Sequence, residues 1–445
     1  MKRQKQISYL LIVLMWSTFS GIYAQENEIP KEERMAWFKD AKLGIFIHWG
    51  IYSVDGIDES WSFYNGYISY DDYMKQLNGF TAKKYNPDYW ALLIKESGAK
   101  YAVITTKHHD GVALWNTDQS DLNVVDKTKA KRDLIRPFAK AIRGQGLKLG
   151  LYYSLLDWSN PNYPNFIRGQ KRYESDETKW NMFVDFNFGQ LKELTRFNPD
   201  LYWFDGDWEQ SAEKWKAKEI RELLLGNNPY AIINSRLQGY GDYSTPEQGV
   251  PIMVPRNNYW ELCMTMNNSW GYQQNDNEYK SVNQIIRIFV DVISMGGNLL
   301  LDIGPKADGT IPEEQVDILT GLGKWTSKHE SAIYGTIAGI PSDFTTNKTA
   351  LSKDSTTLFL YVDNKPNGPL LIKGIKNKIN RIWVVGNGTK LSYKVVGKQY
   401  WSDVPGLLYV ELPEHVQDDD VTVIAVLLDD KIDLYGREGQ VIESN

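Results

Sequence analysis

Short apolar segments alternate with longer amphipathic segments between about residue 40 and residue 335. Segments of about six residues that are apolar nearly throughout are typical of strands buried on both faces of a parallel sheet. We therefore expect seven parallel strands: Leu43–His48, Tyr101–Thr106, Lys148–Tyr153, Asp200–Asp205, Tyr230–Ser235, a segment near Asn258–Met264, and Asn298–Ile303.

The segments between these predicted strands show the periodicity of amphipathic helices. Several of the predicted helices begin near Asp, Ser or Pro and end at Gly, as capped helices do. They are Asp88–Ser97, Asp133–Arg143, Phe183–Arg196, Ala217–Leu225, Ser281–Met295 and Glu313–His329. This alternation over roughly 300 residues predicts an α/β fold, a (β/α)8-type barrel with one strand hidden or irregular. An open doubly wound sheet is the alternative, but it would need a glycine-rich phosphate turn where this chain has His48-Trp49-Gly50.

The pattern changes after about residue 335. Short apolar segments separated by Asn-Gly, Pro-Gly and Asp-rich turns predict a C-terminal antiparallel β-sandwich. Its expected strands are Thr357–Val362, Leu370–Ile375, Arg381–Val385, Leu391–Val396, Leu407–Leu412 and Val421–Leu427. We expect the barrel to occupy residues 25–337 and the sandwich residues 338–445.

Residues 1–24 have the layout of a secretory signal peptide. Lys2, Arg3 and Lys5 precede the largely apolar segment Ile7–Ile22, and Ala24 precedes a polar run. We expect cleavage after Ala24 and export to the periplasm or the medium. No later segment is long and apolar enough for a membrane span of about 20 residues, so we expect no membrane association after cleavage.

The composition of the 445 residues narrows the possible functions. A net charge of -6 argues against a nucleic-acid partner. The single Cys excludes a disulfide framework within the chain and a Cys-rich zinc site. The aromatic content of 13% suits either a large core or a sugar-binding surface.

Two carboxylates on different predicted strands, Asp205 and Glu261, suggest chemistry at one rim of the barrel. Functional residues of such barrels lie at the carboxyl ends of the strands. Retaining glycosidases use two carboxyl groups about 5–5.5 Å apart, one as nucleophile and one as general acid and base. Trp203 shares a strand face with Asp205, and Trp260 precedes Glu261, so apolar surroundings should raise the pKa of the general acid. Asp207 and Glu209 compete for either role.

The adjacent His108, His109 and Asp110 offer a metal site as an alternative. Neighbouring residues of a strand point to opposite faces, so separate hydrogen bonds are favoured over a shared ion. We expect no metal and no cofactor. We expect Cys263 to serve packing.

Several segments together resemble the α-L-fucosidases of glycoside hydrolase family 29, in the branch that includes the animal lysosomal enzymes. They are GIFIHWG (Gly44–Gly50), TTKHHDG (Thr105–Gly111), GLYYSLLDW (Gly150–Trp158), PDLYWFDGDWE (Pro199–Glu209), WELC (Trp260–Cys263) with SWGY (Ser269–Tyr272), and GGNLLLDIGPKADGTI (Gly296–Ile311). The resemblance implies a barrel followed by a β-sandwich. It also implies metal-free, exo-acting hydrolysis of terminal α-L-fucose, with retention, from a fucosylated oligosaccharide or glycoconjugate.

By position, the resemblance implies roles for individual residues. Asp205, in the Trp-x-Asp-Gly segment, matches the nucleophile, and Glu261, in Trp-Glu-x-Cys, matches the acid/base. The positions that match sugar contacts are His48, His108, His109, Tyr152, Trp203 and Arg236.

The segment Glu59-Ser60-Trp61 departs from the family pattern. The family commonly has Glu directly before this Trp, where the chain has Ser60. Glu59 can contact the sugar beside Trp61 only if it is shifted by one position. This departure bears on the sugar, and a retaining glycosidase for a related sugar such as an α-L-galactoside stays open. A non-catalytic sugar-binding relic is a further alternative, although it would be expected to lack Asp205 or Glu261, and both are present. The surroundings of the fucose methyl group would separate fucose from galactose.

Overall fold

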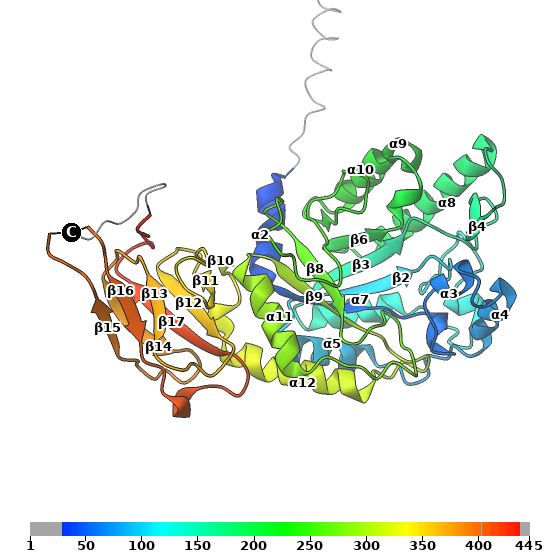
Figure 1. Ribbon diagram of the computed structural model, residues 1–445. Helices are drawn as coiled ribbons and strands as arrows, with labels where there is room; N and C mark the ends of the chain where they lie inside the picture. The colour runs from blue at the N-terminus through cyan, green and yellow to red at the C-terminus, as the bar shows by residue number, and fades with distance from the viewer. Residues whose placement is uncertain (1–28, 402, 437–445) are drawn as a thin grey trace, which may run out of the picture.

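The computed structural model describes residues 29–436 except residue 402, so the predicted signal peptide lies outside the described residues. A barrel domain is followed by a β-sandwich (Figure 1). Within residues 29–436, no helix combines the length and the hydropathy needed to cross a membrane.

Seven parallel strands form the barrel sheet in the order β7-β6-β3-β2-β1-β9-β8. They are β1 (Leu43–Ile47), β2 (Tyr101–Lys107), β3 (Lys148–Ser154), β6 (Leu201–Asp205), β7 (Ile232–Ile233), β8 (Glu261–Thr265) and β9 (Asn298–Ile303). Each overlaps a predicted strand, and the predicted (β/α)8-type barrel is confirmed.

Residues 243–247 take the place of an eighth strand between β7 and β8. Tyr243 forms a parallel bridge with Asn234 beyond β7, and Ser244 forms one with Trp260 before β8. The backbone N–H of Glu261 donates to the carbonyl of Ser244 over 2.9 Å. The expected irregular strand is therefore this short segment, which closes the barrel and ends at Glu247.

The main helices cover the outside of the sheet (Figure 1). They are α5 (Pro87–Glu96), α7 (Ile135–Gly144), α8 (Glu177–Thr195), α10 (Ala217–Asn227), α11 (Val282–Ser294) and α12 (Glu313–Lys328). Side-chain caps fix where several begin, since Asn86 caps α5, Asp176 caps α8, and Ser281 forms a capping box with Gln284 at α11.

Shorter elements lie in the connections. The short helices are α3 (Trp61–Tyr64), α4 (Tyr70–Met74), α6 (Val124–Lys127) and α9 (Ala212–Trp215), with single 3-10 turns at η1 (Ile51–Ser53), η2 (Lys75–Asn78), η3 (Asp207–Glu209), η4 (Glu330–Ala332) and η5 (Glu414–Val416). The strands β4 (Asn165–Ile167) and β5 (Gln170–Lys171) form a small hairpin.

The barrel interior is filled by alternate residues of the strands, since successive side chains of a strand point to opposite faces. This cluster includes Phe46, Tyr152, Trp203, Cys263 and Leu300. The helix α2 (Lys31–Ala41) adds its own buried side chains and closes the amino end of the barrel, where the Asn298 amide donates to the carbonyl of Phe38 over 2.7 Å.

The sandwich consists of a five-stranded sheet, β10-β11-β12-β17-β14, and a three-stranded sheet, β13-β16-β15, both antiparallel. The strands are β10 (Ile337–Ala338), β11 (Lys348–Leu351), β12 (Thr357–Val362), β13 (Leu370–Lys373), β14 (Ile379–Val384), β15 (Tyr393–Val396), β16 (Leu407–Val410) and β17 (Thr422–Leu428). All six predicted strands are present. β10 and β11 were not predicted, and the expected boundary between residues 337 and 338 falls inside β10.

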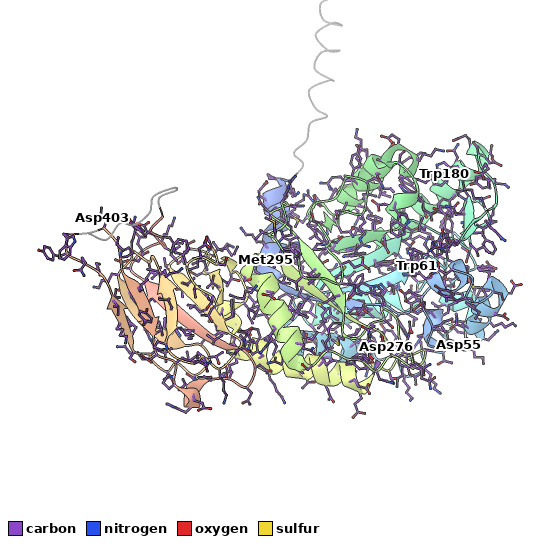
Figure 2. The ribbon with its side chains drawn as sticks, in the orientation of Figure 1. Asp55, Trp61, Trp180, Asp276, Met295 and Asp403 are labelled. Carbon is purple, nitrogen blue, oxygen red and sulfur yellow. The ribbon has the colours of Figure 1, made fainter. Side chains whose placement is uncertain are left out.

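The two domains meet along α11 and α12. The Trp325 indole donates to the carbonyl of Val421 over 2.9 Å, and the Tyr361 hydroxyl donates to the carbonyl of Ala332 over 2.5 Å. Met295, just after α11, lies at this junction, whereas Trp61 lies far from it on the barrel (Figure 2). The junction is remote from the carboxyl end of the barrel strands.

Candidate active site

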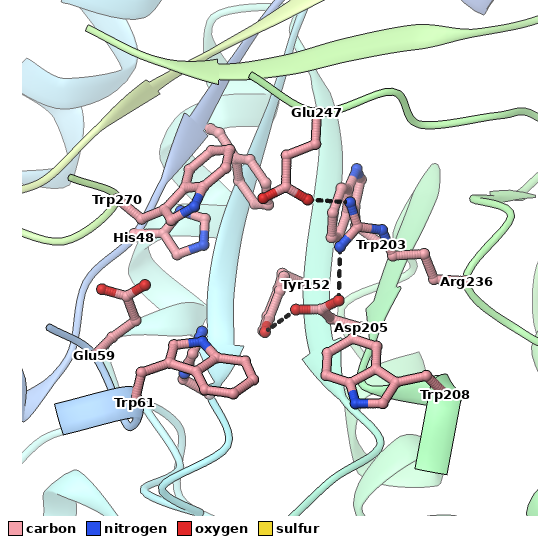
Figure 3. Close-up of a pocket in the computed structure, with 12 residues that line it drawn as sticks. His48, Glu59, Trp61, Tyr152, Trp203, Asp205, Trp208, Arg236, Glu247 and Trp270 are labelled. Carbon is pink, nitrogen blue, oxygen red and sulfur yellow. Dashed lines mark hydrogen bonds and ion pairs between the residues drawn. The ribbon is translucent and has the colours of Figure 1, made fainter. Parts of the chain in front are cut away.

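A pocket opens at the carboxyl end of the barrel strands (Figure 3). It is lined by Phe46, His48, Glu59, Trp61, His108, Tyr152, Trp203, Asp205, Trp208, Arg236, Glu247 and Trp270. Eight of the ten residues predicted for the site are among these. The two others are His109, which lies directly behind Asp205, and Glu261, which lies elsewhere.

Asp205 is the last residue of β6 and is held from two sides. Its Oδ2 accepts a hydrogen bond of 3.0 Å from the Tyr152 hydroxyl, and its Oδ1 accepts one of 2.8 Å from Arg236. Gly206 ends the strand with φ +79°, and a Cβ there would lie 2.5 Å from the Leu156 side chain. Only glycine fits this turn, so the turn fixes the direction in which the Asp205 carboxylate leaves the sheet.

Arg236 joins two carboxylates. Its second arm donates to Glu247 Oε2 over 2.6 Å, so the guanidinium lies between Asp205 and Glu247 (Figure 3). The Arg236 guanidinium also lies 4.6 Å from the Trp203 ring, a cation–π contact. One planar group thus orients both carboxylates toward the same pocket.

Glu247 was not singled out from the sequence. It stands in the irregular segment that closes the barrel, which has no strand pattern, so the chain offers no periodic signal for it. The Glu247 side chain is 41% exposed, against 12% for Asp205. Glu247 therefore lies on the open side of the pocket, where a leaving group would depart.

Glu261 lies outside the pocket. It is the first residue of β8, at the amino end of the strand, and it is fully buried. Its carboxyl group accepts hydrogen bonds from the Tyr101 hydroxyl and, over 3.0 Å, from the Trp203 indole. Burial raises the pKa of Glu261 to about 7, although these hydrogen bonds oppose the shift. A carboxyl group in this position cannot contact a sugar in the pocket, which counts against the predicted acid/base role.

Three histidines face the pocket or its floor, each held through Nδ1. His48 bonds Asp302 over 2.7 Å, His108 bonds Ser60 over 2.7 Å, and His109 bonds Ser154 over 2.6 Å. Burial lowers the pKa of all three, for His109 to about 3. The imidazoles are thus neutral.

The free nitrogen of His109 is positioned for a ligand. Ser154 donates its own proton to the carbonyl of Leu156 over 2.7 Å, so His109 Nδ1 must carry the hydrogen. His109 Nε2 is then an acceptor, and it has no hydrogen-bond partner among the described residues. It lies 3.6 Å from Asp205 Oδ2, so a donor such as a sugar hydroxyl would relieve an unfavourable contact between two acceptors.

Glu59, rather than Ser60, reaches the pocket. Glu59 and Trp61 both line it, whereas the buried Ser60 hydroxyl bonds His108. The backbone turns sharply at Ser60, with φ +31°, and this turn directs Glu59 inward. Glu59 therefore lies beside Trp61 at the pocket, one position earlier in the chain than the residue directly before Trp61. Burial raises the pKa of Glu59 to about 8, so at neutral pH its carboxyl group is protonated and can donate a hydrogen bond.

His108, His109 and Asp205 are the group within the described residues that could hold a metal ion, with possible ligand atoms within 4.8 Å of one another. Arg236 already balances the charge of Asp205. A second cation would be repelled there, so the arrangement suits hydroxyl groups better than a metal.

Aromatic rings form two sides of the pocket. Phe46 lies 4.9 Å from Trp203 and 6.1 Å from Trp270 between ring centroids, so the three form an apolar wall. On the other side, Trp61 and Trp208 are nearly parallel, with centroids 6.4 Å apart, and Trp208 is 50% exposed. Rings of this kind stack on the apolar faces of sugars, and Trp208 is the ring at the mouth.

Two bridged carboxylates, neutral imidazoles and aromatic walls at the carboxyl end of a barrel define a glycoside hydrolase. The sequence matches the α-L-fucosidase family over residues 18–331. The chain belongs to this family, glycoside hydrolase family 29.

Curated relatives are similar over most of their length. An α-L-fucosidase of Dictyostelium discoideum is 33% identical over 367 residues, which cover 74% of this chain and 77% of the relative. Human tissue α-L-fucosidase is 30% identical over 419 residues, which cover 85% of each chain.

Solved structures are similar in both domains. The α-L-fucosidase isoenzyme 1 of Paenibacillus thiaminolyticus matches with a TM-score of 0.82 and 33% identity, over 90% of this chain and all of the other. A family 29 α-L-fucosidase of Bacteroides thetaiotaomicron, trapped as a covalent intermediate, matches with a TM-score of 0.78 and 28% identity, over 89% of this chain and 96% of the other.

Proposed function

We propose that the chain is an exo-acting, retaining α-L-fucosidase that releases terminal α-L-fucose from fucosylated oligosaccharides or glycoconjugates. In this proposal Asp205 is the nucleophile and Glu247 is the acid/base. The observation that carries it is the Arg236 guanidinium, which bonds both carboxylates at the pocket.

In the first step, an oxygen of Asp205 attacks the anomeric carbon while the bond from that carbon to the leaving oxygen breaks. Glu247 gives its proton to the leaving oxygen, and a glycosyl ester on Asp205 forms. In the second step, Glu247 takes a proton from a water molecule. The water oxygen bonds the anomeric carbon, and the Asp205 ester breaks to return the carboxylate.

We assign the acid/base role to Glu247 rather than to Glu261 because the Glu247 carboxyl group is accessible from the pocket. Its side chain is 41% exposed on the open side of the pocket, whereas Glu261 is fully buried behind the Trp203 ring. A general acid must reach the leaving oxygen within hydrogen-bond distance, directly or through one water. Arg236 orients Glu247 toward the same space as Asp205.

The apolar wall of Phe46, Trp203 and Trp270 supports fucose over galactose. Fucose carries a methyl group where galactose carries a hydroxymethyl group. A hydroxyl placed against these rings would lose its hydrogen bonds to water, which costs roughly 1–3 kcal/mol by protein mutational data. The polar side of the pocket, with His48, His108 and Glu59, suits the ring hydroxyls.

The test is an assay of the purified protein on matched substrates. Aryl α-L-fucoside, aryl α-L-galactoside and a panel of differently linked fucosyl-oligosaccharides are compared by kcat/KM, and NMR at early times identifies the first anomer released. We expect fucosides to be favoured and α-L-fucose to appear first. Higher kcat/KM for the galactoside, initial β-L-fucose, or fucose binding without turnover would each contradict the proposal.

We also propose that the enzyme is exported, because of the basic and apolar pattern of residues 1–24. N-terminal sequencing of the protein from periplasmic and culture fractions should give a chain that begins at Gln25. A chain that retains Met1 and stays in the cytoplasmic fraction would contradict export.

A further inference from the structure

Glu261 occupies an unusual place for a carboxyl group, inside the closed end of the barrel. Tyr101 begins β2 as Glu261 begins β8, and the Tyr101 ring lies across Gly44 of β1, where a Cβ would come within 2.3 Å of it. The chain thus makes room for Tyr101, whose hydroxyl donates to Glu261 Oε2. Burying a carboxyl group without hydrogen-bond partners costs free energy, and Glu261 has such partners in the fold.

The other oxygen of Glu261 holds Trp203. The Trp203 indole N–H donates to Glu261 Oε1 over 3.0 Å, and both side chains are buried. An indole N–H is a single donor with a fixed direction, so this bond sets the rotation of the ring about its side-chain axis. The Trp203 ring is a wall of the pocket.

The two side chains that donate hydrogen bonds to Asp205 both contact the Trp203 ring. The Tyr152 ring stacks on it with a centroid distance of 5.7 Å and an interplanar angle of 18°, and the Arg236 guanidinium lies 4.6 Å from it. Tyr152 and Arg236 then bond the two oxygens of Asp205. A continuous set of contacts therefore leads from Glu261 through one indole to the nucleophile.

We infer that Glu261 is a positioning residue, which acts through the Trp203 indole to hold Tyr152 and Arg236 against Asp205. This inference rests on the proposed role of Asp205 as the nucleophile. Glu261 exchanges no proton with the substrate. Its loss would let the indole turn, and a displacement of about 1 Å at a reacting group can cost about 100-fold in rate.

The experiment compares three variants of Glu261 in the full chain. Glu261→Gln keeps an acceptor for the indole but cannot act as an acid, whereas Glu261→Leu removes the acceptor. Glu261→Asp shortens the side chain by one methylene and so withdraws the carboxylate from the Trp203 indole. It replaces the Leu variant in the comparison if the Leu variant does not fold. Each is assayed with an activated aryl fucoside and with a fucosyl-oligosaccharide, with and without azide.

We expect the Gln variant to keep most of its kcat/KM on both substrates. The Leu and Asp variants should lose kcat/KM by about 10- to 100-fold, equally for both substrates and without rescue by azide. Glu247→Gln is the matched variant, and its loss should be much larger on the oligosaccharide.

Two results would overturn the inference. Selective loss of oligosaccharide hydrolysis in Glu261→Gln, restored on the aryl fucoside by azide, would make Glu261 the acid/base. Wild-type kcat/KM in a folded Leu variant, or in the Asp variant, would make its role purely structural. Failure of the proposed function looks different, because Asp205→Ala would then retain turnover whatever happens at Glu261.

Discussion

Arg236 lies 2.8 Å from Asp205, with Nη1 directed at Oδ1 of the carboxylate. Its second arm bonds Glu247 Oε2 over 2.6 Å, so one side chain orients both proposed catalytic groups. The planar fork of an arginine can do this, whereas a lysine is a single point donor. The relative position of the two carboxylates therefore depends on this one guanidinium.

Arg236→Lys should keep the charge and lose the bridge. We expect kcat/KM to fall about 10- to 100-fold, because a hydrogen bond to a charged group contributes about 1.5–3 kcal/mol. Steady-state kinetics on an aryl fucoside measures this. Arg143→Lys is the control, since Arg143 pairs with Asp200 over 3.3 Å before β6, outside the pocket, and should leave kcat/KM unchanged. Equal kinetics in both variants would contradict the bridge.

Glu247→Ala should lower the rate of hydrolysis by an amount that depends on the leaving group of the substrate. Protonation matters little when the leaving aryl group is a weak base and greatly when it is a sugar hydroxyl, so general acid catalysis of about 100- to 10,000-fold is lost selectively. A series of aryl fucosides of graded leaving-group pKa gives the slope. Azide should restore turnover of the activated substrate and yield fucosyl azide. A flat slope with no azide product would remove Glu247 from this role.

Gly206→Ala should disturb both stability and activity. The positive φ of +79° costs roughly 1–2 kcal/mol for any residue with a Cβ, and the added atom would press on Leu156 beside Asp205. Gly169→Ala is a close control, since Gly169 has φ +77° and nothing within 4 Å of a Cβ. Denaturant unfolding and kcat of both variants are the measurements. We expect similar backbone strain in both and a lower kcat in Gly206→Ala alone; unchanged kcat there would contradict the role of this turn.

Glu59→Gln should change how stability depends on pH. The folded pKa of Glu59 is about 8 because of burial, whereas an unfolded Glu loses its proton near pH 4.5. Between these values the unfolded state binds fewer protons, so the free energy of unfolding falls as pH rises, by at most ~1.4 kcal/mol per pH unit. Urea unfolding between pH 5 and pH 8 should show a shallower decline in Glu59→Gln. Parallel curves for the two proteins would contradict a protonated Glu59.

Most of the barrel could be predicted because its strands are apolar throughout and several of its helices begin at a capping residue. Seven strands follow from that pattern, and with them the position of Asp205 at the carboxyl end of β6. The segment at residues 243–247 could not be predicted, because isolated bridges to its neighbours, rather than its own sequence pattern, hold it in the sheet. Glu247 was missed for the same reason.

The acid/base prediction shows the limit of assigning a rim position from sequence. The strand predicted near Asn258–Met264 continues past Glu261, and this prediction places Glu261 at the rim of the barrel. In the structure β8 begins at Glu261 and ends at Thr265, so the carboxyl group enters the barrel from its closed end. The register of β8 against Asn298, the first residue of β9, fixes this position. The pattern of apolar residues in this segment alone does not determine its register against the neighbouring strand.

Covalent labelling tests the central claim most directly. The protein is incubated with 2-fluoro-fucosyl fluoride, and the labelled peptide is identified by mass spectrometry. The fluorine at C2 slows both formation and hydrolysis of the glycosyl ester, whereas the fluoride at C1 is a good leaving group that keeps formation fast enough for the ester to accumulate. We expect one fluorofucosyl group per chain, attached to Asp205, and no label in Asp205→Ala. A label on Glu247, Glu261 or Asp207, or continued hydrolysis of aryl fucoside by Asp205→Ala without added nucleophile, would contradict the account.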